Sequence, residues 1–398
     1  MSGHVVIDPG RARPQQYGVA IYNANLLNAI SEIAPQDIQV EQLALADPAE
    51  MIPGWQIPAS NLKYRRMPVM RLLAGIAGAI WRPSLDFIVA GRHGIYHALI
   101  ATEALAIDPS RRLVSVHDAS LFRDDIADEF SSETRVECRQ TLESSAGVVT
   151  VSEFSRRELL EHLDLDESRI AVVPGGVDHM RFFPRSEEEV TAVRNRYGLP
   201  NRYVISVAGG IPRKRLGDVE AMADKLWKKD RIETVVVGSG RGSRPGAKRL
   251  GFVPREHLPA LYTGAVAFIS MSEYEGFGLA PLESVACGTP VIAARADAIV
   301  EVLGDVASFV EVGDVDGASK AVEKVTEKRA RRKRVQAGLE LAQNFRWEET
   351  AQKMLCVYRS MMSGEAISTA SSQRIAAGLS IGDAVEAGES EVEAEPAK

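Results

Sequence analysis

The chain has 398 residues, of which 45% are hydrophobic and 25% charged, and its formal net charge is −7. These values are typical of a globular protein, and the length suits two domains better than one hydrophobic core. The negative charge gives no support for a general nucleic-acid-binding protein, so we expect no nucleic-acid partner. No apolar run reaches the roughly 20 residues of a membrane-spanning helix, and the three cysteines are too far apart to suggest a metal site.

The first half of the chain alternates short runs rich in Val and Ile with helical stretches, which is the pattern of a parallel α/β sheet. The first run follows the N-terminus without a signal-peptide pattern, so we expect a cytoplasmic protein with reduced cysteines. The pattern predicts strands at residues 4–8, 95–97, 113–117, 147–151 and 170–173, and helices at 19–33 and 133–145.

The second half repeats this alternation after a crossing segment at residues 182–186. Because ligands of such doubly wound sheets bind beyond the carboxyl ends of the strands, we expect a site in a cleft between two domains. The tail at 363–398 is rich in Gly, Ala, Ser and Glu and lacks aromatic residues, so we predict that it is acidic and disordered. Strands are predicted at residues 203–208, 233–237, 265–271, 291–294 and 308–310.

The most informative motif is the run Glu-Gly-Phe-Gly-Leu-Ala-Pro-Leu-Glu at residues 275–283. It follows a predicted strand and opens a predicted helix, so Glu275 and Glu283 flank a glycine-rich turn at a helix N-terminus. Free N–H groups and the helix dipole favour an anion in such a turn. The two carboxylates suit hydroxyl groups on either side of that anion, as a nucleotide-sugar would offer. The alternative is a strand–turn–helix unit whose glutamates are solvated.

This run, with Ser-Val-Ala-Cys-Gly-Thr-Pro-Val-Ile-Ala at 284–293, closely resembles the two-glutamate signature of retaining glycosyltransferases of the GT-B fold. The family is glycosyltransferase family 4, the glycosyl transferases group 1, whose members include bacterial mannosyltransferases. The resemblance extends from residue 4 to about residue 360. It implies an α/β protein with two doubly wound Rossmann-like domains that face each other across a cleft. The implied parts are an acceptor domain at 1–184, a nucleotide-sugar domain at 185–345 and a final helix at 346–362 that crosses back.

The resemblance implies how the second domain would hold the donor. Glu283 would hold the ribose hydroxyls and Glu275 the sugar. The distal phosphate would face the backbone N–H groups of the turn, which belong to Phe277, Gly278 and Leu279.

Arg213 and Lys214 follow a predicted strand and a glycine-rich turn, and by resemblance they would grip the diphosphate. Many family members carry a further Arg where this chain has Gly209, and the alternative is a solvated basic turn. The segment 250–254, which includes Val253, would meet the nucleotide base through its backbone. Backbone recognition leaves guanine, uracil and thymine open.

On the first domain, His117 and Asp118 end a predicted strand and face the cleft. By resemblance the histidine would lie near the reacting carbon of the sugar and donate a hydrogen bond, and Asp118 would orient its ring or cap the next turn. The alternative is a strand-end histidine with a capping aspartate. Gly18 resembles the family's glycine loop near the donor diphosphate. His97 either lines the acceptor side or packs in the core.

Three other segments allow two interpretations each. Residues 65–81 are basic and amphipathic, which favours a helix packed on the first sheet and leaves peripheral contact with a membrane as the alternative. The Asp-Leu-Asp run at 164–166 is spelled like a metal-binding motif, but a helix-to-strand turn is the favoured interpretation. The Ser-Glu-Phe-Ser run at 152–155 matches a family landmark and is interpreted as a helix cap.

The sequence therefore predicts a metal-independent retaining transferase that moves a hexose from a nucleotide-diphosphate sugar to a hydroxyl acceptor. By resemblance, the Ile-Pro-Arg-Lys run at 211–214 favours the mannosyl- or rhamnosyltransferase branch of the family, with a mannose-like hexose preferred, and GDP-mannose, UDP-sugars and dTDP-sugars remain candidate donors. The acceptor would be a glycan or a lipid-linked molecule in cell-envelope synthesis, with no further cofactor. The rivals are a non-catalytic nucleotide-sugar-binding protein that assists another transferase, and a phosphorylase or hydrolase of the same fold.

Overall fold

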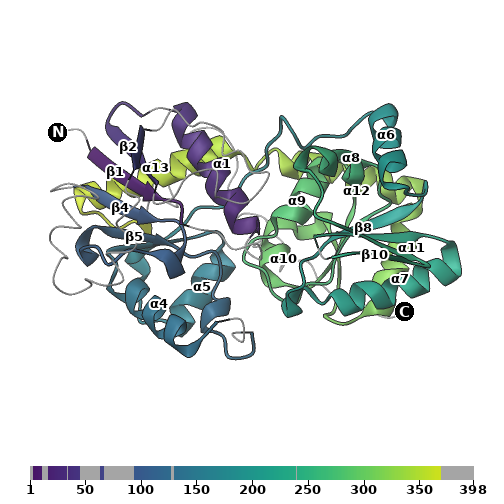
Figure 1. Cartoon of the computed structure of the whole chain (residues 1–398), viewed down its shortest axis with the longest axis horizontal. Helices are drawn as coiled ribbons and strands as arrows, with labels where there is room; N and C mark the ends of the chain where they lie inside the picture. The colour runs from purple at the N-terminus through teal and green to yellow at the C-terminus, as the bar shows by residue number, and fades with distance from the viewer. Residues whose placement is uncertain are drawn as a thin grey trace, which may run out of the picture.

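The structure is a computed structural model that describes residues 3–10, 17–33, 35–44, 63–66, 94–126, 130–238 and 240–368. These residues form two α/β bodies side by side, and each is built around a seven-stranded sheet (Figure 1). The strands are short and mostly buried, as in parallel sheets that helices cover on both faces.

The first sheet is entirely parallel and has the strand order β3-β2-β1-β4-β5-β6-β7. The order reverses between β1 and β4, and this reversal is the switch point where open α/β sheets bind ligands. The strands are β1 (Gly3–Asp8), β2 (Ile38–Ala44), β3 (Lys63–Arg66), β4 (Ile95–Ala98), β5 (Arg112–Ser115), β6 (Gly147–Thr150) and β7 (Ile170–Val172). The helices of this body are α1 (Tyr17–Ile33), α4 (Ser132–Ser144) and α5 (Glu153–His162).

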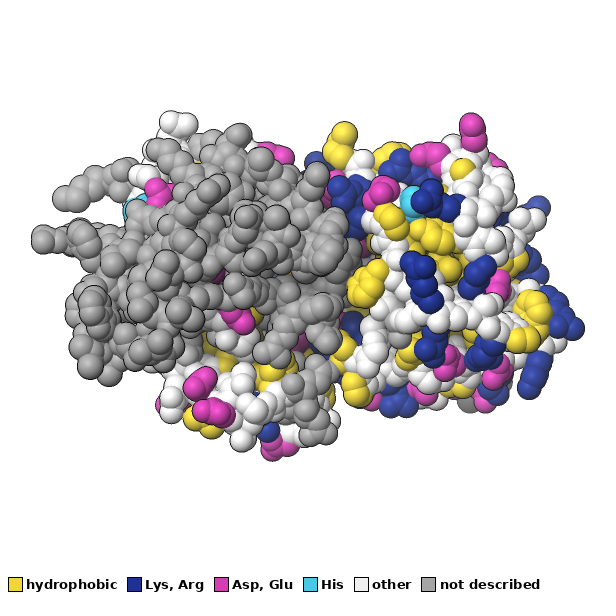
Figure 2. Space-filling view, viewed as in Figure 1, with side chains coloured by type: hydrophobic (Ala, Val, Ile, Leu, Met, Phe, Trp, Pro, Cys, Tyr) yellow, Lys and Arg dark blue, Asp and Glu magenta, His cyan; other side chains and the backbone are white. Residues whose placement is uncertain are grey.

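The second sheet has the order β10-β11-β9-β8-β12-β13-β14, and only its edge pair β10–β11 is antiparallel. Its strands are β8 (Tyr203–Val207), β9 (Glu233–Val237), β10 (Arg241–Arg244), β11 (Ala247–Gly251), β12 (Phe268–Ser270), β13 (Val291–Ala294) and β14 (Ser308–Val310). The helices are α6 (Glu187–Tyr197), α7 (Leu216–Asp230), α8 (Leu258–Thr263), α9 (Leu279–Ala286), α10 (Asp297–Leu303), α11 (Val315–Thr326) and α12 (Lys328–Ala342). Figure 2 shows acidic and basic side chains intermixed on one face of this body.

The last helix, α13 (Trp347–Ser363), leaves the second body and packs against α1 and β1 of the first (Figure 1). Its buried Tyr358 makes a hydrogen bond of 2.8 Å to the imidazole of His97 on β4. The ordered chain continues past the expected boundary at residue 363, because Ile367 is only 3% exposed and belongs to the main hydrophobic core. Residues 369–398 of the predicted tail lie outside the described residues.

The structure has strands at all the predicted positions, but the sequence analysis missed β2, β3, β10 and β11. These strands carry polar residues inside the run, such as Glu41 and Gln42 of β2, so they lack the apolar signal of the central strands. The predicted basic helix at 65–81 is wrong at its start, because Arg65 and Arg66 belong to β3; residues 67–81 lie outside the described residues. Among the described helices, none is long and apolar enough to span a membrane.

Candidate active site

A cleft of about 490 Å³ lies between the two bodies, and residues from both line its walls. Residues that follow β5, β8 and β12 converge on it, as expected for the carboxyl ends of parallel strands. All the predicted site residues except Val253 line this cleft; they are Gly18, His117, Asp118, Arg213, Lys214, Glu275, Phe277, Gly278, Leu279 and Glu283. The side chain of Val253 is buried in the core, and the neighbouring Phe252, which is 61% exposed, lines the cleft. Contact of the 250–254 backbone with the nucleotide base stays a prediction.

The glycine-rich turn opens helix α9 without a side-chain cap. Gly278 is the N-cap residue and has φ 96°, a conformation that favours glycine. Because the N-cap residue is a glycine, it offers no side-chain acceptor to the first turn of α9, and this turn lines the cleft at the positive end of the helix dipole. This arrangement can hold an anion.

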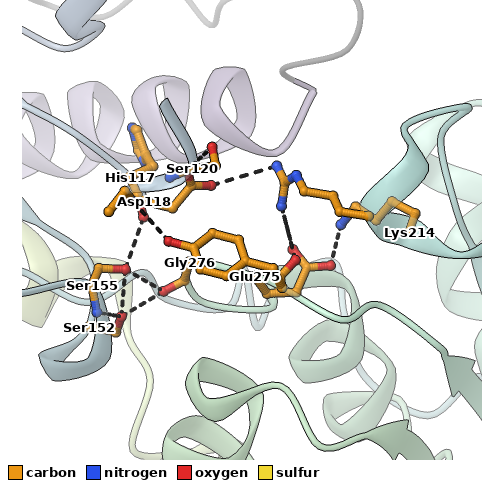
Figure 3. Close-up of polar contacts among 11 residues, drawn as sticks. His117, Asp118, Ser120, Ser152, Ser155, Lys214, Glu275 and Gly276 are labelled. Carbon is orange, nitrogen blue, oxygen red and sulfur yellow. Dashed lines mark hydrogen bonds and ion pairs between the residues drawn. The ribbon is translucent and has the colours of Figure 1, made fainter. Parts of the chain in front are cut away.

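Four charged side chains form one network beside this turn (Figure 3). Lys214 forms a salt bridge with Glu275. The Arg213 guanidinium lies 3.8 Å from Glu275 and 3.6 Å from Asp118, so it joins the two bodies. Arg213 also donates a hydrogen bond of 3.1 Å to the carbonyl of Tyr274. The 3₁₀ turn Pro212–Lys214 places the two cations next to each other after β8.

This network keeps both carboxyl groups ionised. Burial alone would raise the pKa of Glu275, but the charges of Lys214 and Arg213 outweigh it, so the pKa lies below its usual value. The balance is similar for Asp118. Burial raises its pKa, but the charge of Arg213 and the hydrogen bonds from Ser120 outweigh this effect, so the pKa lies below its usual value. Of the two roles expected for Asp118, the structure has the cap, because its carboxylate accepts from the Ser120 N–H at 3.0 Å.

His117 is half-buried at the cleft wall with its ring edge-on to Tyr22, the two ring centroids being 4.9 Å apart. Burial lowers its pKa to about 4, so the imidazole is neutral at pH 7. A backbone hydrogen bond with Leu99 and the charge of Asp118 oppose this fall in the pKa. Nε2 has no hydrogen-bond partner among the described residues. A hydrogen bond from the His117 ring to the sugar therefore stays a prediction, and Nε2 is the ring nitrogen left for it.

Glu283 lies inside the first helical turns of α9 and pairs with a residue that the sequence analysis missed. Arg255 Nη2 donates a hydrogen bond of 2.8 Å to Glu283 Oε1, and both side chains are largely buried. Burial raises the pKa of Glu283, and the Arg255 charge opposes that rise. Arg255 also lies over the ring of Phe182 in the segment between the two bodies. In the sequence Arg255 directly follows the segment 250–254, and no other signal marks it.

Two other predicted features lie away from the cleft. His97 packs in the core, where Tyr358 and Ser115 each make a hydrogen bond to its ring, and it does not line the acceptor side. In the Asp-Leu-Asp run, Asp166 caps a short 3₁₀ turn by accepting from the Ser168 N–H at 2.7 Å, and both aspartates are exposed. The turn interpretation of this run is therefore confirmed.

Comparison with known proteins identifies the family. The family described as "Glycosyltransferase Family 4" matches residues 18–181, and "Glycosyl transferases group 1" matches residues 191–338. The O-antigen chain mannosyltransferase B of Escherichia coli is 30% identical over 63% of this chain and 70% of its own length. The chain belongs to the group 1 glycosyltransferases. A D-inositol 3-phosphate glycosyltransferase of Salinispora tropica is 27% identical to this glycosyltransferase over 87% of the chain and 81% of the relative.

Solved structures of the same architecture establish the GT-B fold of this glycosyltransferase. A sucrose-phosphate synthase from Thermosynechococcus elongatus aligns with a TM-score of 0.70 at 18% identity, over 91% of this chain and 100% of the neighbour. Anabaena HepE, solved in complex with UDP-glucose, aligns with a TM-score of 0.67 at 16% identity, over 90% and 99% of the two chains. The predicted fold class is therefore confirmed.

Proposed function

We propose that this glycosyltransferase moves a mannose-like hexose, with retention at the anomeric carbon, from a nucleotide-diphosphate sugar to a hydroxyl of a glycan or lipid-linked acceptor. The observation that carries the proposal is the uncapped turn of α9, which has two cations beside it, the half-buried Glu275 on one side and the buried Glu283 on the other. A diphosphate fits the turn and the cations, and the glutamates fit hydroxyls of the ribose and the hexose. The relatives named as a mannosyltransferase and an inositol phosphate glycosyltransferase support transfer in glycan synthesis.

In the proposed reaction, the bond between the anomeric carbon and the phosphate oxygen breaks as the acceptor oxygen bonds to the same face of that carbon. Lys214 and Arg213 stabilise the charge that develops on the leaving diphosphate, which is the largest electrostatic demand of the step. Asp118 and Glu275 are both ion-paired, so the proton of the acceptor passes to a leaving phosphate oxygen. The neutral His117 ring makes a hydrogen bond through Nε2 with a hydroxyl of the sugar.

A panel of GDP-mannose, UDP-glucose, dTDP-rhamnose and ADP-glucose tests this function. The true donor should raise the melting temperature by mass action, and it should then release its nucleoside diphosphate when acceptors are added. Stabilisation by a donor without release for any acceptor would favour the non-catalytic alternative. No stabilisation by any of the four would contradict the proposal.

We also expect transfer to be independent of divalent metal, because Lys214 and Arg213 occupy the place where a cation is needed beside the turn. Transfer rates with saturating EDTA should equal those with added magnesium. Loss of transfer in EDTA that magnesium or manganese restores would show that the two side chains are insufficient.

The two glutamates should have separable effects. Glu283→Ala should weaken the binding of the bare nucleoside diphosphate, because the lost carboxylate faces the ribose in the proposed complex. Glu275→Ala should leave that affinity close to the wild-type value and lower turnover, since its proposed partner is the sugar. Calorimetry with the nucleoside diphosphate and steady-state rates on both variants decide this point. Equal losses of affinity would contradict the division of roles.

A further inference from the structure

The first turn of helix α5, in the first body, makes contacts with the second body that a helix cap does not require. Ser152 caps α5 by accepting a hydrogen bond from the Ser155 N–H at 3.1 Å. The same hydroxyl lies 2.7 Å from the carbonyl oxygen of Gly276 and donates to it (Figure 3). Ser152 is buried, so this bond is shielded from water.

The hydroxyl group of Ser155 contacts a backbone carbonyl of each body. It lies 3.3 Å from the carbonyl oxygen of His117 and 3.3 Å from that of Gly276. The two backbones are in contact here, because a Cβ at Gly276 would lie 2.1 Å from the His117 oxygen. Only glycine allows this approach. The turn that carries Glu275 is therefore held directly against the strand end that carries His117 and Asp118.

A carboxylate of the second body completes the contact. Glu301 on α10 accepts from the N–H groups of Glu153 at 2.8 Å and Phe154 at 2.7 Å. These first-turn N–H groups have no partner within their own helix, and a negative charge at a helix N-terminus is stabilising. Burial raises the pKa of Glu301, and these two hydrogen bonds oppose the rise.

We propose that Ser152, Ser155 and Glu301 form an interdomain latch that holds the cleft closed and positions the Glu275–Phe277 turn for transfer. The three are positioning residues, because they act through Gly276 and α5 and do not line the cleft themselves. The inference rests on the proposed function for its kinetic consequence only, since closure itself can be measured without a substrate.

The latch predicts an effect on turnover rather than on nucleotide affinity. The groups proposed to hold the nucleoside diphosphate, Glu283 and Lys214, both belong to the second body. The reaction also needs His117, which comes from the first body. Loss of the latch reduces the fraction of molecules in which both sets are in place, and it leaves the nucleotide site intact.

The test uses Glu301→Ala and Ser152→Ala in the full chain, with Ser186→Ala as the matched control. Ser186 also caps a helix, α6, but its hydrogen bonds go to Glu189 of the same helix, so its loss reports on a missing cap alone. Spin labels at Val136→Cys and Val312→Cys, two exposed positions on different bodies, report the interdomain distance. The chain without added cysteines controls for labelling of Cys356.

Both latch variants should show longer and broader interdomain distances than wild type, and Ser186→Ala should not. With the donor found by the panel, kcat should fall by about tenfold or more in Glu301→Ala, which loses charge-assisted hydrogen bonds, and by less in Ser152→Ala, which loses a neutral one. Their affinity for the nucleoside diphosphate should stay within about twofold of wild type. An unchanged distance distribution in Glu301→Ala overturns the latch, whether or not the rate changes. If the panel finds no donor, the proposed function is contradicted, but the interdomain distances still show whether the three residues hold the cleft closed.

Discussion

Lys214→Ala should reduce the rate of sugar transfer by about 30- to 1,000-fold, which corresponds to a loss of about 2–4 kcal/mol of transition-state stabilisation. The ammonium group lies at the cleft beside the uncapped turn of α9, where the leaving diphosphate gains charge in the proposed reaction. A contact that strengthens as this charge develops lowers kcat when it is removed, and it affects ground-state binding less. Steady-state kinetics with the identified donor measure both quantities.

Lys229→Ala is the matched control for this prediction. Lys229 is also a lysine paired with a glutamate in the second body, but it is exposed on α7 and does not line the cleft. Its removal should leave the transfer rate unchanged, because an exposed ion pair contributes little. A Lys214→Ala enzyme within threefold of the wild-type rate would show that Lys214 is only a partner of Glu275.

The salt bridge between Lys214 and Glu275 also bears on how the donor enters. In the structure Lys214 is bound to the glutamate that we assign to the sugar. A diphosphate that attracts Lys214 would release Glu275 to accept hydrogen bonds from hydroxyl groups. Transfer of Lys214 from Glu275 to the diphosphate would thus form the phosphate contact and free Glu275 for the sugar contact. Such an exchange costs less free energy than leaving a buried charge unpaired, because both groups stay ion-paired or hydrogen-bonded throughout.

The local motifs could be predicted from the sequence because each is a continuous stretch with a distinct pattern. The turn at 275–283, the bases at 213–214 and the His117–Asp118 pair all follow strands, and the strand ends of parallel sheets meet at one edge. The central strands could be predicted too, because each is a continuous apolar run. The polar strand β2 and the edge strands carried too weak a pattern to be recognised.

The sequence could not indicate which polar groups pair across long separations. Arg255 with Glu283, Tyr358 with His97 and Ser152 with Gly276 join segments that only the tertiary fold brings together. Seen locally, Ser152 is a complete helix cap, so nothing in its surroundings in the sequence suggested a second contact.

Removing the chain from residue 344 onward should destabilise the protein by several kcal/mol or more, which is the typical cost of losing several large buried side chains. The loss would uncover α1 and β1, against which α13 packs. It would also leave the imidazole of His97 without Tyr358, and a buried polar group without a partner costs free energy. Buried residues of α13 that would be lost include Ala351, Met354, Leu355, Val357 and Tyr358.

Two shorter truncations locate the end of the folded chain. A protein that ends at residue 368 should keep the melting temperature and transfer rate of the full chain, because residues 369–398 have the composition of a disordered tail. A protein that ends at residue 363 should lose about 1–3 kcal/mol, because it lacks the buried Ile367. Urea unfolding of the three truncated proteins beside the full chain gives the order. If the protein that ends at residue 363 is as stable as the one that ends at residue 368, Ile367 does not stabilise the core. If the protein that ends at residue 343 is equally stable, α13 is not part of the folded unit.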